Sequence, residues 1–272
     1  MPRSVAVVTD STAYLPPTPG VSVVPVQVIS HGVPYDEGSF TGDLASATTS
    51  RPAPSRFAAC YAALAAEGAS AVVSVHLSSS LSGTSESALL AAKEAPVPVE
   101  VVDSGSIALG VGYPVLAAAR AASRGAGMEE VAGEAARCAG RTRTYFYADS
   151  LEHLRRGGRV GTAASLVGSA LAIKPLLHVI DGRVELLEKV RTATRAIARL
   201  EDLAVGAAEQ GGGPVEVAVQ HLGAPSRAEA LAERLSARLP PLTELRVVEV
   251  GAVIGVHVGP GMLGLTVCLP GD

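Results

Sequence analysis

Short apolar strands alternate with helical segments along the first half of the chain, and this alternation restricts the choice of fold more than any other feature. The predicted strands cover residues 4–10, 21–29, 71–77 and 99–102. The predicted helices cover residues 54–67, 112–124 and 128–139, with one more around residues 88–92. Strands and helices in this order form βαβ units around a parallel sheet. We therefore predict a Rossmann-like α/β domain over residues 1–145.

The pattern changes from about Thr142, where a hairpin and further strands follow. Two apolar runs flank Asp181-Gly182, and this dipeptide is a strong hairpin signal. The other predicted elements are a strand and short helix at 144–154, helices at 192–210 and 226–239, and strands at 215–220, 245–258 and 262–269. Residues 146–272 are therefore predicted to form a second α/β domain with a mixed sheet.

Seven hydroxyl side chains lie between Ser78 and Ser87, in the stretch HLSSSLSGTSESALLAAK, where a strand gives way to a helix. The unpaired N–H groups at the start of a helix favour an anion, and hydroxyls add donors without adding charge. A simpler interpretation is that Ser82 or Thr84 caps the helix, but a cap uses only one or two side chains. We therefore predict a site for a small anionic group, with Gly83 as the flexible point of the turn.

Other residues that suit an anion are scattered along the chain. Thr49-Ser50, in TSRPAPS, either forms a turn before a helix or contributes hydroxyls. The stretch LRRGGRVG at 154–161 places three arginines around two glycines, which suits an oxyanion or a solvent-exposed turn. Arg191 is either a phosphate-facing arginine or a surface charge. His257, at the end of the predicted strand, is either structural or a donor to a carboxylate or phosphate.

Composition and motifs argue against several other classes of protein. The formal net charge is −4, whereas a nucleic-acid-binding surface is usually basic. Three widely spaced cysteines fit free thiols in a reducing cytoplasm, and no set of metal ligands is visible. The uncharged run 104–119 is short for a membrane span. We therefore expect a cytoplasmic protein without a metal site.

The sequence shows no catalytic or nucleotide-binding motif in the context that such a motif requires, so it gives no support for a complete enzyme. GPGMLG at 259–264 matches the dinucleotide pattern, but it precedes a predicted strand near the end of the sequence instead of opening a helix. No P-loop and no G-x-S-x-G nucleophile elbow occurs. A serine hydrolase that uses Ser82 with His257 would also lack an obvious acidic residue to orient the histidine.

Taken together, the motifs resemble the DegV family of fatty-acid-binding proteins over nearly the whole chain. In sequence order they are VVTDSTAYLP, PVQVI, TSRPAPS, SSSLSGTSESA, VVDSGSIALGVG, LEHLRRGGRV, IKPLL with DGRVELLEKVRT, and VIGVHVGPGMLG. The combination of SxLSGT, GGR and HxGPG is specific. Two positions depart from the family pattern: TSRPAPS replaces the more frequent TSQPS, and Ser85 replaces an aromatic residue that often follows SGT.

The resemblance implies a two-domain α/β fold with a long-chain fatty acid in a tunnel between residues 1–145 and residues 146–272. It implies that Thr49 and Ser82 hydrogen-bond the carboxylate and that His257 belongs to the same network. Ser79 and Gly83 are expected neighbours. Burying roughly fourteen methylenes contributes up to about 11 kcal/mol at ~0.8 kcal/mol each, before association costs. The tail would supply affinity, and the hydroxyls would supply orientation.

The resemblance also implies a partner. In the family, the lipid-binding protein presents the acyl carboxylate to a separate ATP-dependent fatty acid kinase subunit, which makes an acyl phosphate for phospholipid metabolism in bacteria. Arg159 would support phosphoryl transfer or dock the kinase, and Arg191 would be a second such residue. The expected ligand is the fatty acid, no cofactor is expected, and lipid exchange would involve transient contact with a membrane surface. A stand-alone fatty acid binding or transport protein without a kinase partner is the alternative.

Overall fold

The computed structural model describes residues 4–159, 173–239 and 242–271, and its chain divides into two compact units. Unit 1 comprises Met1–Phe40 and Thr49–Gly140, and unit 2 comprises Thr41–Thr48 and Arg141–Asp272. The short segment Thr41–Thr48 therefore groups with the second half of the chain. The order of predicted strands and helices did not indicate this excursion.

Unit 1 contains a four-stranded parallel sheet in the order β2-β1-β6-β7. Its strands are β1 (Ser4–Asp10), β2 (Val21–Val24), β6 (Ala69–His76) and β7 (Val99–Asp103). Successive side chains of a strand point to opposite faces of the sheet. Val7 and Val8 accordingly belong to two different buried clusters. The predicted parallel sheet is confirmed.

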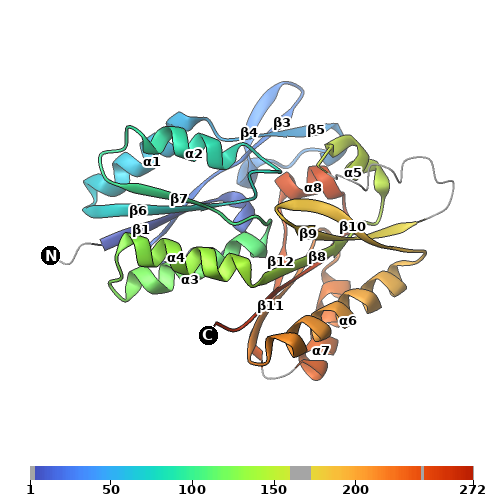
Figure 1. Ribbon diagram of the computed structural model, residues 1–272. Helices are drawn as coiled ribbons and strands as arrows, with labels where there is room; N and C mark the ends of the chain where they lie inside the picture. Colours follow the sequence, from blue (N-terminus) through green and yellow to red (C-terminus); the bar gives the residue numbers. More distant parts are fainter. Residues whose placement is uncertain (1–3, 160–172, 240–241, 272) are drawn as a thin grey trace. The chain divides into compact units, whose positions relative to one another are not determined.

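Two pairs of helices cover the two faces of this sheet (Figure 1). They are α1 (Pro54–Ala66) with α2 (Thr84–Ala92), and α3 (Leu109–Ser123) with α4 (Met128–Gly140). The pair α1 and α2 buries Phe57 and Tyr61 against Val8 and Val72. The pair α3 and α4 buries Val111 and other small aliphatic side chains on the opposite face. Both layers are built mainly from Val and Ala, as the composition requires.

The single strand predicted over residues 21–29 is wrong, because it is two strands in different sheets. Strand β2 ends at Val24, and Gln27–Ser30 forms β3. Pro25 lies between them, and a proline has no N–H to donate to a strand ladder. Strand β3 belongs to a three-stranded sheet in the order β4-β3-β5. Its other strands are β4 (Val33–Asp36) and β5 (Ala47–Ser50). Short 3-10 helices lie next to strands: η1 (Ser11–Ala13) follows β1, η2 (Glu37–Ser39) follows β4, and η3 (Leu44–Ser46) precedes β5.

Unit 2 contains a six-stranded mixed sheet in the order β10-β9-β8-β13-β11-β12. Its strands are β8 (Thr142–Tyr147), β9 (Lys174–Ile180), β10 (Arg183–Val190), β11 (Val215–His221), β12 (Leu242–Glu249) and β13 (Leu263–Cys268). Strands β11 and β12 are parallel, and the other neighbouring pairs are antiparallel. The hairpin β9–β10 turns at Asp181 and Gly182, which both have positive φ. The predicted mixed sheet and hairpin are confirmed.

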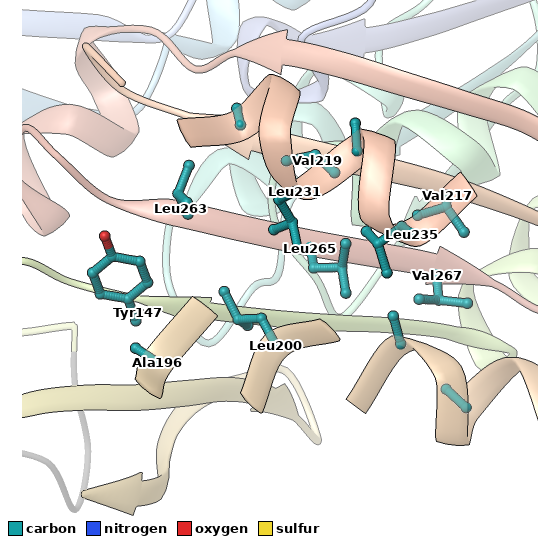
Figure 2. Close-up of a cluster of buried hydrophobic side chains, with 14 of the residues drawn as sticks. Tyr147, Ala196, Leu200, Val217, Val219, Leu231, Leu235, Leu263, Leu265 and Val267 are labelled. Atoms are coloured by element: carbon teal, nitrogen blue, oxygen red, sulfur yellow. The ribbon is translucent and has the colours of Figure 1, made fainter. Parts of the chain in front are cut away.

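The core of unit 2 lies between its sheet and the helices α6 (Ala193–Gly211) and α7 (Pro225–Arg238). Figure 2 shows Leu200 of α6 and Leu231 of α7 directed towards Leu265 on β13. All three side chains are fully buried. The two helices therefore hold the central strands by an apolar contact that runs along much of their length.

The strand predicted over residues 245–258 is wrong in its second half. Strand β12 ends at Glu249, and Ala252–Val258 forms helix α8. Four of its seven side chains are buried aliphatic groups. A short apolar run that is buried on all sides has the same composition in a strand and in a helix, so periodicity does not separate the two. Helix α5 (Leu151–Gly157) packs against α8.

Candidate functional site

The hydroxyl-rich stretch forms a tight turn between β6 and α2 in unit 1. The carbonyl oxygen of Ser78 accepts hydrogen bonds from the N–H groups of Leu81 and Ser82, at 3.0 and 3.1 Å. The N–H of Ser78 donates to the carbonyl of Ser106 at 2.8 Å, which ties the turn to the segment after β7. We call residues 78–83 the hydroxyl turn. These bonds fix the backbone of the turn, and with it the positions of the Cα atoms that carry the hydroxyl side chains.

Helix α2 begins at the end of this turn without a side-chain cap. Gly83 is the N-cap residue, and it has no side chain that could accept from the first N–H groups of the helix. The hydroxyl of Ser82 lies 2.8 Å from the hydroxyl of Thr84 instead. The simpler interpretation, that Ser82 or Thr84 caps the helix, is therefore wrong. The helix start keeps N–H donors that an anion can use.

Gly83 does not serve as a flexible point, because its φ of −73° and ψ of 16° are open to any residue. Its lack of a side chain gives space to Arg51. A Cβ at position 83 would lie 2.6 Å from Nη1 of Arg51. The Arg51 guanidinium also pairs with Glu86 in the first turn of α2. The sequence analysis did not name Arg51 as a site residue. The signal for it in the sequence is its place in TSRPAPS, a stretch that departs from the family pattern.

The predicted neighbours of the anion occupy different positions around this turn. Thr49 lies on β5, is partly buried, and stands two residues before Arg51, so the side chain of Arg51 brings this segment next to Gly83. Ser79 is exposed, and its N–H donates to both carboxylate oxygens of Asp103, at 3.2 and 3.3 Å. Ser79 therefore offers its hydroxyl, whereas its backbone is already used.

In unit 2, His257 lies on α8 against the end of α5. A Cβ at Gly157 would lie 2.5 Å from Nδ1 of His257 and 3.2 Å from its Cα, so only glycine permits this approach. Burial, with the positive charges of Arg159 and Arg156, lowers the pKa of His257 to about 4, although a hydrogen bond with the Gly157 backbone opposes this change. His257 is therefore neutral at pH 7. Because the unfolded chain would take up this proton first, unit 2 loses stability as the pH falls from about 6.5 towards 4.

Two arginines carry the positive charges that act on this histidine: Arg156 in the last turn of α5, and Arg159 two residues after its end. Nη1 of Arg159 donates to the carbonyl oxygen of Gly157 at 2.9 Å, and Nη2 of Arg156 donates to the carbonyl oxygen of Leu44 at 3.1 Å. Both side chains are exposed. Val160 and Gly161, which complete the LRRGGRVG motif, lie outside the described residues. Arg191 is also exposed and lies between β10 and α6.

Residues 4–159, 173–239 and 242–271 contain neither a cluster of metal ligands nor a helix suited to a membrane span. No group of three or more His, Cys, Asp or Glu side chains in these ranges is placed to hold a metal ion. None of the helices in the same ranges has the length and apolar character needed to cross a membrane.

Residues 4–269 match the model of the DegV family, which is described as an uncharacterised protein family. The chain belongs to the DegV family. A DegV domain-containing protein of Streptomyces coelicolor is 52% identical over 280 residues, which cover 98% of this chain and 99% of that relative. The resemblance seen in the motifs is confirmed.

Solved DegV structures share the fold of this chain. A fatty-acid-binding DegV family protein from Thermus thermophilus superposes with a TM-score of 0.90 at 35% identity, covering 98% of this chain and 100% of that one. DegV of Bacillus subtilis, described as a fatty acid binding protein, gives a TM-score of 0.85 at 34% identity, with 98% and 99% covered. The predicted α/β class, with a parallel and a mixed sheet, is the DegV class. The roles of Thr49, Ser79, Ser82, Gly83, Arg159, Arg191 and His257 stay predictions.

Proposed function

We propose that this DegV protein binds a long-chain fatty acid and presents its carboxylate to a separate ATP-dependent fatty acid kinase subunit, which converts it into an acyl phosphate. The observation that carries the proposal is the start of α2, which has no side-chain cap and where the hydroxyls of Ser82 and Thr84 lie 2.8 Å apart, so that their mutual hydrogen bond uses only one of the two hydroxyl protons. The DegV proteins of Thermus thermophilus and Bacillus subtilis, which are described as fatty acid binding, support the choice of ligand.

The chemistry of the ligand suits this set of donors. A carboxylate that leaves water needs hydrogen-bond partners, and each charge-assisted bond contributes about 1.5–3 kcal/mol. We assign these bonds to the Ser82 hydroxyl, the Thr49 hydroxyl and the first N–H groups of α2, with Ser79 and Gly83 as neighbours. Neutral donors leave the carboxylate nucleophilic, whereas a bidentate arginine would reduce its reactivity. Arg51 pairs with Glu86, which supports the assignment of neutral donors, and not of this arginine, to the carboxylate.

We assign phosphoryl transfer to unit 2. Arg159 would stabilise the charge of the transferring phosphoryl group or dock the kinase, with Arg191 as a second arginine. We assign the neutral His257 to the hydrogen bonds that hold the carboxylate, together with Ser82 and Thr49. The phosphoryl donor would be ATP on the partner. The fatty acid tunnel between the domains, the 1–145 and 146–272 boundaries, and transient contact with a membrane surface stay predictions.

Native mass spectrometry of the purified protein tests the ligand. We expect a mass increment that equals one long-chain fatty acid and that disappears after extraction with organic solvent. Addition of a purified fatty acid kinase subunit, ATP and the lipid-loaded protein then tests the partner, with ADP release as the readout. A lipid increment without stimulated ADP release would favour a stand-alone binding or transport protein. Absence of any bound or exchangeable fatty acid would contradict the proposal.

A further inference from the structure

Four polar side chains form a hydrogen-bonded chain inside unit 1, directly behind the hydroxyl turn. Tyr61 Oη donates to Ser74 Oγ at 2.9 Å, Ser74 Oγ lies 2.7 Å from His76 Nε2, and His76 Nδ1 lies 3.0 Å from Asp10 Oδ2. All four residues are 0% exposed. Buried polar groups destabilise a fold unless they are hydrogen-bonded. These four hydrogen-bonded side chains therefore call for a structural or functional explanation.

The direction of hydrogen bonding follows from the Asp10 end. The carboxylate of Asp10 accepts from the Leu77 N–H at 3.1 Å, from the Thr12 N–H at 3.1 Å and from the Thr12 hydroxyl at 2.5 Å. With these donors directed at it, the carboxylate is an acceptor for the His76 ring as well. His76 Nδ1 therefore carries the proton, and Nε2 accepts from the Ser74 hydroxyl. Every member of the chain is satisfied by this one arrangement.

The distances resemble those of a Ser-His-Asp triad, but the surroundings do not suit hydrolysis. A nucleophilic serine must reach its substrate. Ser74 points into the interior from β6, is fully buried, and accepts from Tyr61. Asp10, at the end of this series of hydrogen bonds, instead accepts from the backbone N–H of Leu77, which is the residue before the hydroxyl turn. Asp10 thus fixes the point at which the turn begins.

A second set of bonds leaves the same segment in another direction. The hydroxyls of Ser11 and Tyr14 donate to the two carboxylate oxygens of Glu37, at 2.5 and 2.6 Å. The Ser11 hydroxyl also accepts from the Val26 N–H at 3.1 Å, and the Glu37 N–H donates to the Val26 carbonyl at 3.1 Å. Glu37 is buried. These bonds tie the segment after β1 to the start of the three-stranded sheet, whose strand β5 carries Thr49.

We propose that residues 10–14 are a positioning hub for the ligand-binding hydroxyls of unit 1. Asp10 holds the start of the hydroxyl turn through Leu77, and Ser11 and Tyr14 hold the sheet of Thr49 through Glu37. None of the hub residues needs to contact the ligand. The inference rests on the proposed function, because it concerns the relative placement of Ser82 and Thr49.

Variants of His76 and Asp10 test the hub through fatty-acid affinity, measured by isothermal titration calorimetry with oleic acid. We expect Asp10→Asn to weaken binding about tenfold or more, because its amide presents donors to the Leu77 and Thr12 donors. His76→Asn keeps a donor near the Nδ1 position and should bind within about threefold of the wild type, whereas His76→Leu should lose about tenfold. Ser87→Ala is the matched control, because the buried Ser87 hydroxyl on α2 has no partner among the described residues.

Equal binding by the wild type and Asp10→Asn, or equal losses in His76→Asn and His76→Leu, would overturn the hub. If Asp10→Asn does not fold, the His76 pair carries the test. A ligand-free readout separates the hub from the proposed function. In proton–nitrogen spectra the His76 ring should carry its proton on Nδ1, and amide signals of residues 77–82 and of Thr49 should move in Asp10→Asn and Glu37→Gln respectively. Unmoved signals contradict the hub even if the wild type binds no fatty acid.

Discussion

Replacing Arg159 with alanine is expected to reduce kinase-dependent acyl-phosphate formation by a factor on the order of 10²–10³, with fatty-acid binding nearly unchanged. In the proposed reaction a carboxylate oxygen attacks the γ-phosphorus of ATP, and ADP leaves. Negative charge on the oxygens of the transferring phosphoryl group is stabilised by a cation in the transition state. Binding of the fatty acid before this step does not require that cation. We assign this role to Arg159, whose exposed side chain donates a hydrogen bond to the carbonyl oxygen of Gly157.

The measurement is ADP release with saturating fatty acid, together with the dissociation constant of the fatty acid without the kinase. Arg155→Ala is the matched control, since Arg155 is an exposed arginine on α5, four residues before Arg159. It should keep acyl-phosphate formation within about threefold of the wild type, as expected for an exposed charge. Loss of fatty-acid binding in Arg159→Ala, or an equal loss of activity in Arg155→Ala, would contradict the separation of binding from transfer.

The same variant has a second readout in His257. Burial and the charges of Arg159 and Arg156 lower the pKa of this ring to about 4. Removing the Arg159 charge should raise that pKa, because one of the groups that disfavour the imidazolium is gone. Titration by NMR spectroscopy in the absence of lipid would show the change. An unchanged pKa would mean that Arg159 lies too far from His257 to influence it.

Gly157→Ala is expected to destabilise unit 2 and to weaken fatty-acid binding. The added Cβ would lie 2.5 Å from Nδ1 of His257 and 3.2 Å from its Cα, so α5 and α8 would have to move apart. Overpacking of this kind costs about 1–3 kcal/mol. The neutral imidazole that we assign to the carboxylate network would move with α8. Binding should therefore fall about tenfold if one hydrogen bond is lost.

Urea unfolding and calorimetric titration of the same preparations give both quantities. Gly206→Ala provides the control: Gly206 lies within α6, and a Cβ there meets no atom within 4 Å. That change should stabilise the protein by about 0.5–1 kcal/mol, since alanine favours a helix interior over glycine. Equal stability of the two variants would show that α5 and α8 do not approach as closely as described.

Local patterns predicted most elements because they depend on neighbours in the sequence. Asp181-Gly182 indicated the hairpin, whose turn has positive φ at both residues, and the helix predicted over residues 192–210 is α6, with Thr192 as its N-cap. Pro25 was also a visible signal, and the split between β2 and β3 was predictable from its missing N–H. Helix α8 was not, because its apolar residues are buried on all sides and carry no period.

Residues of the candidate site could be named from the sequence where a motif is continuous, and could not be named where a pairing depends on tertiary contacts. The hydroxyl turn is one stretch of sequence, so its residues could be named in advance. Arg51 reaches Gly83 across the fold, and its pairing with Glu86 joins residues 35 positions apart. His76 and Asp10 are 66 residues apart and looked like ordinary strand residues. Pairings at such separations arise from strand order, which the local pattern does not state.

The most direct test of the account is the carbon-13 signal of oleic acid labelled at its carboxyl carbon and bound to the protein. We predict one signal of an ionised carboxylate that shifts in Ser82→Ala and in Thr49→Ala. Ser80→Ala changes an exposed hydroxyl of the same turn and should leave the signal in place. The claim that uncharged donors at the start of α2 hold the acid would be contradicted by a bound carboxyl signal that does not shift in Ser82→Ala and Thr49→Ala. A shift of equal size in Ser80→Ala would contradict it as well.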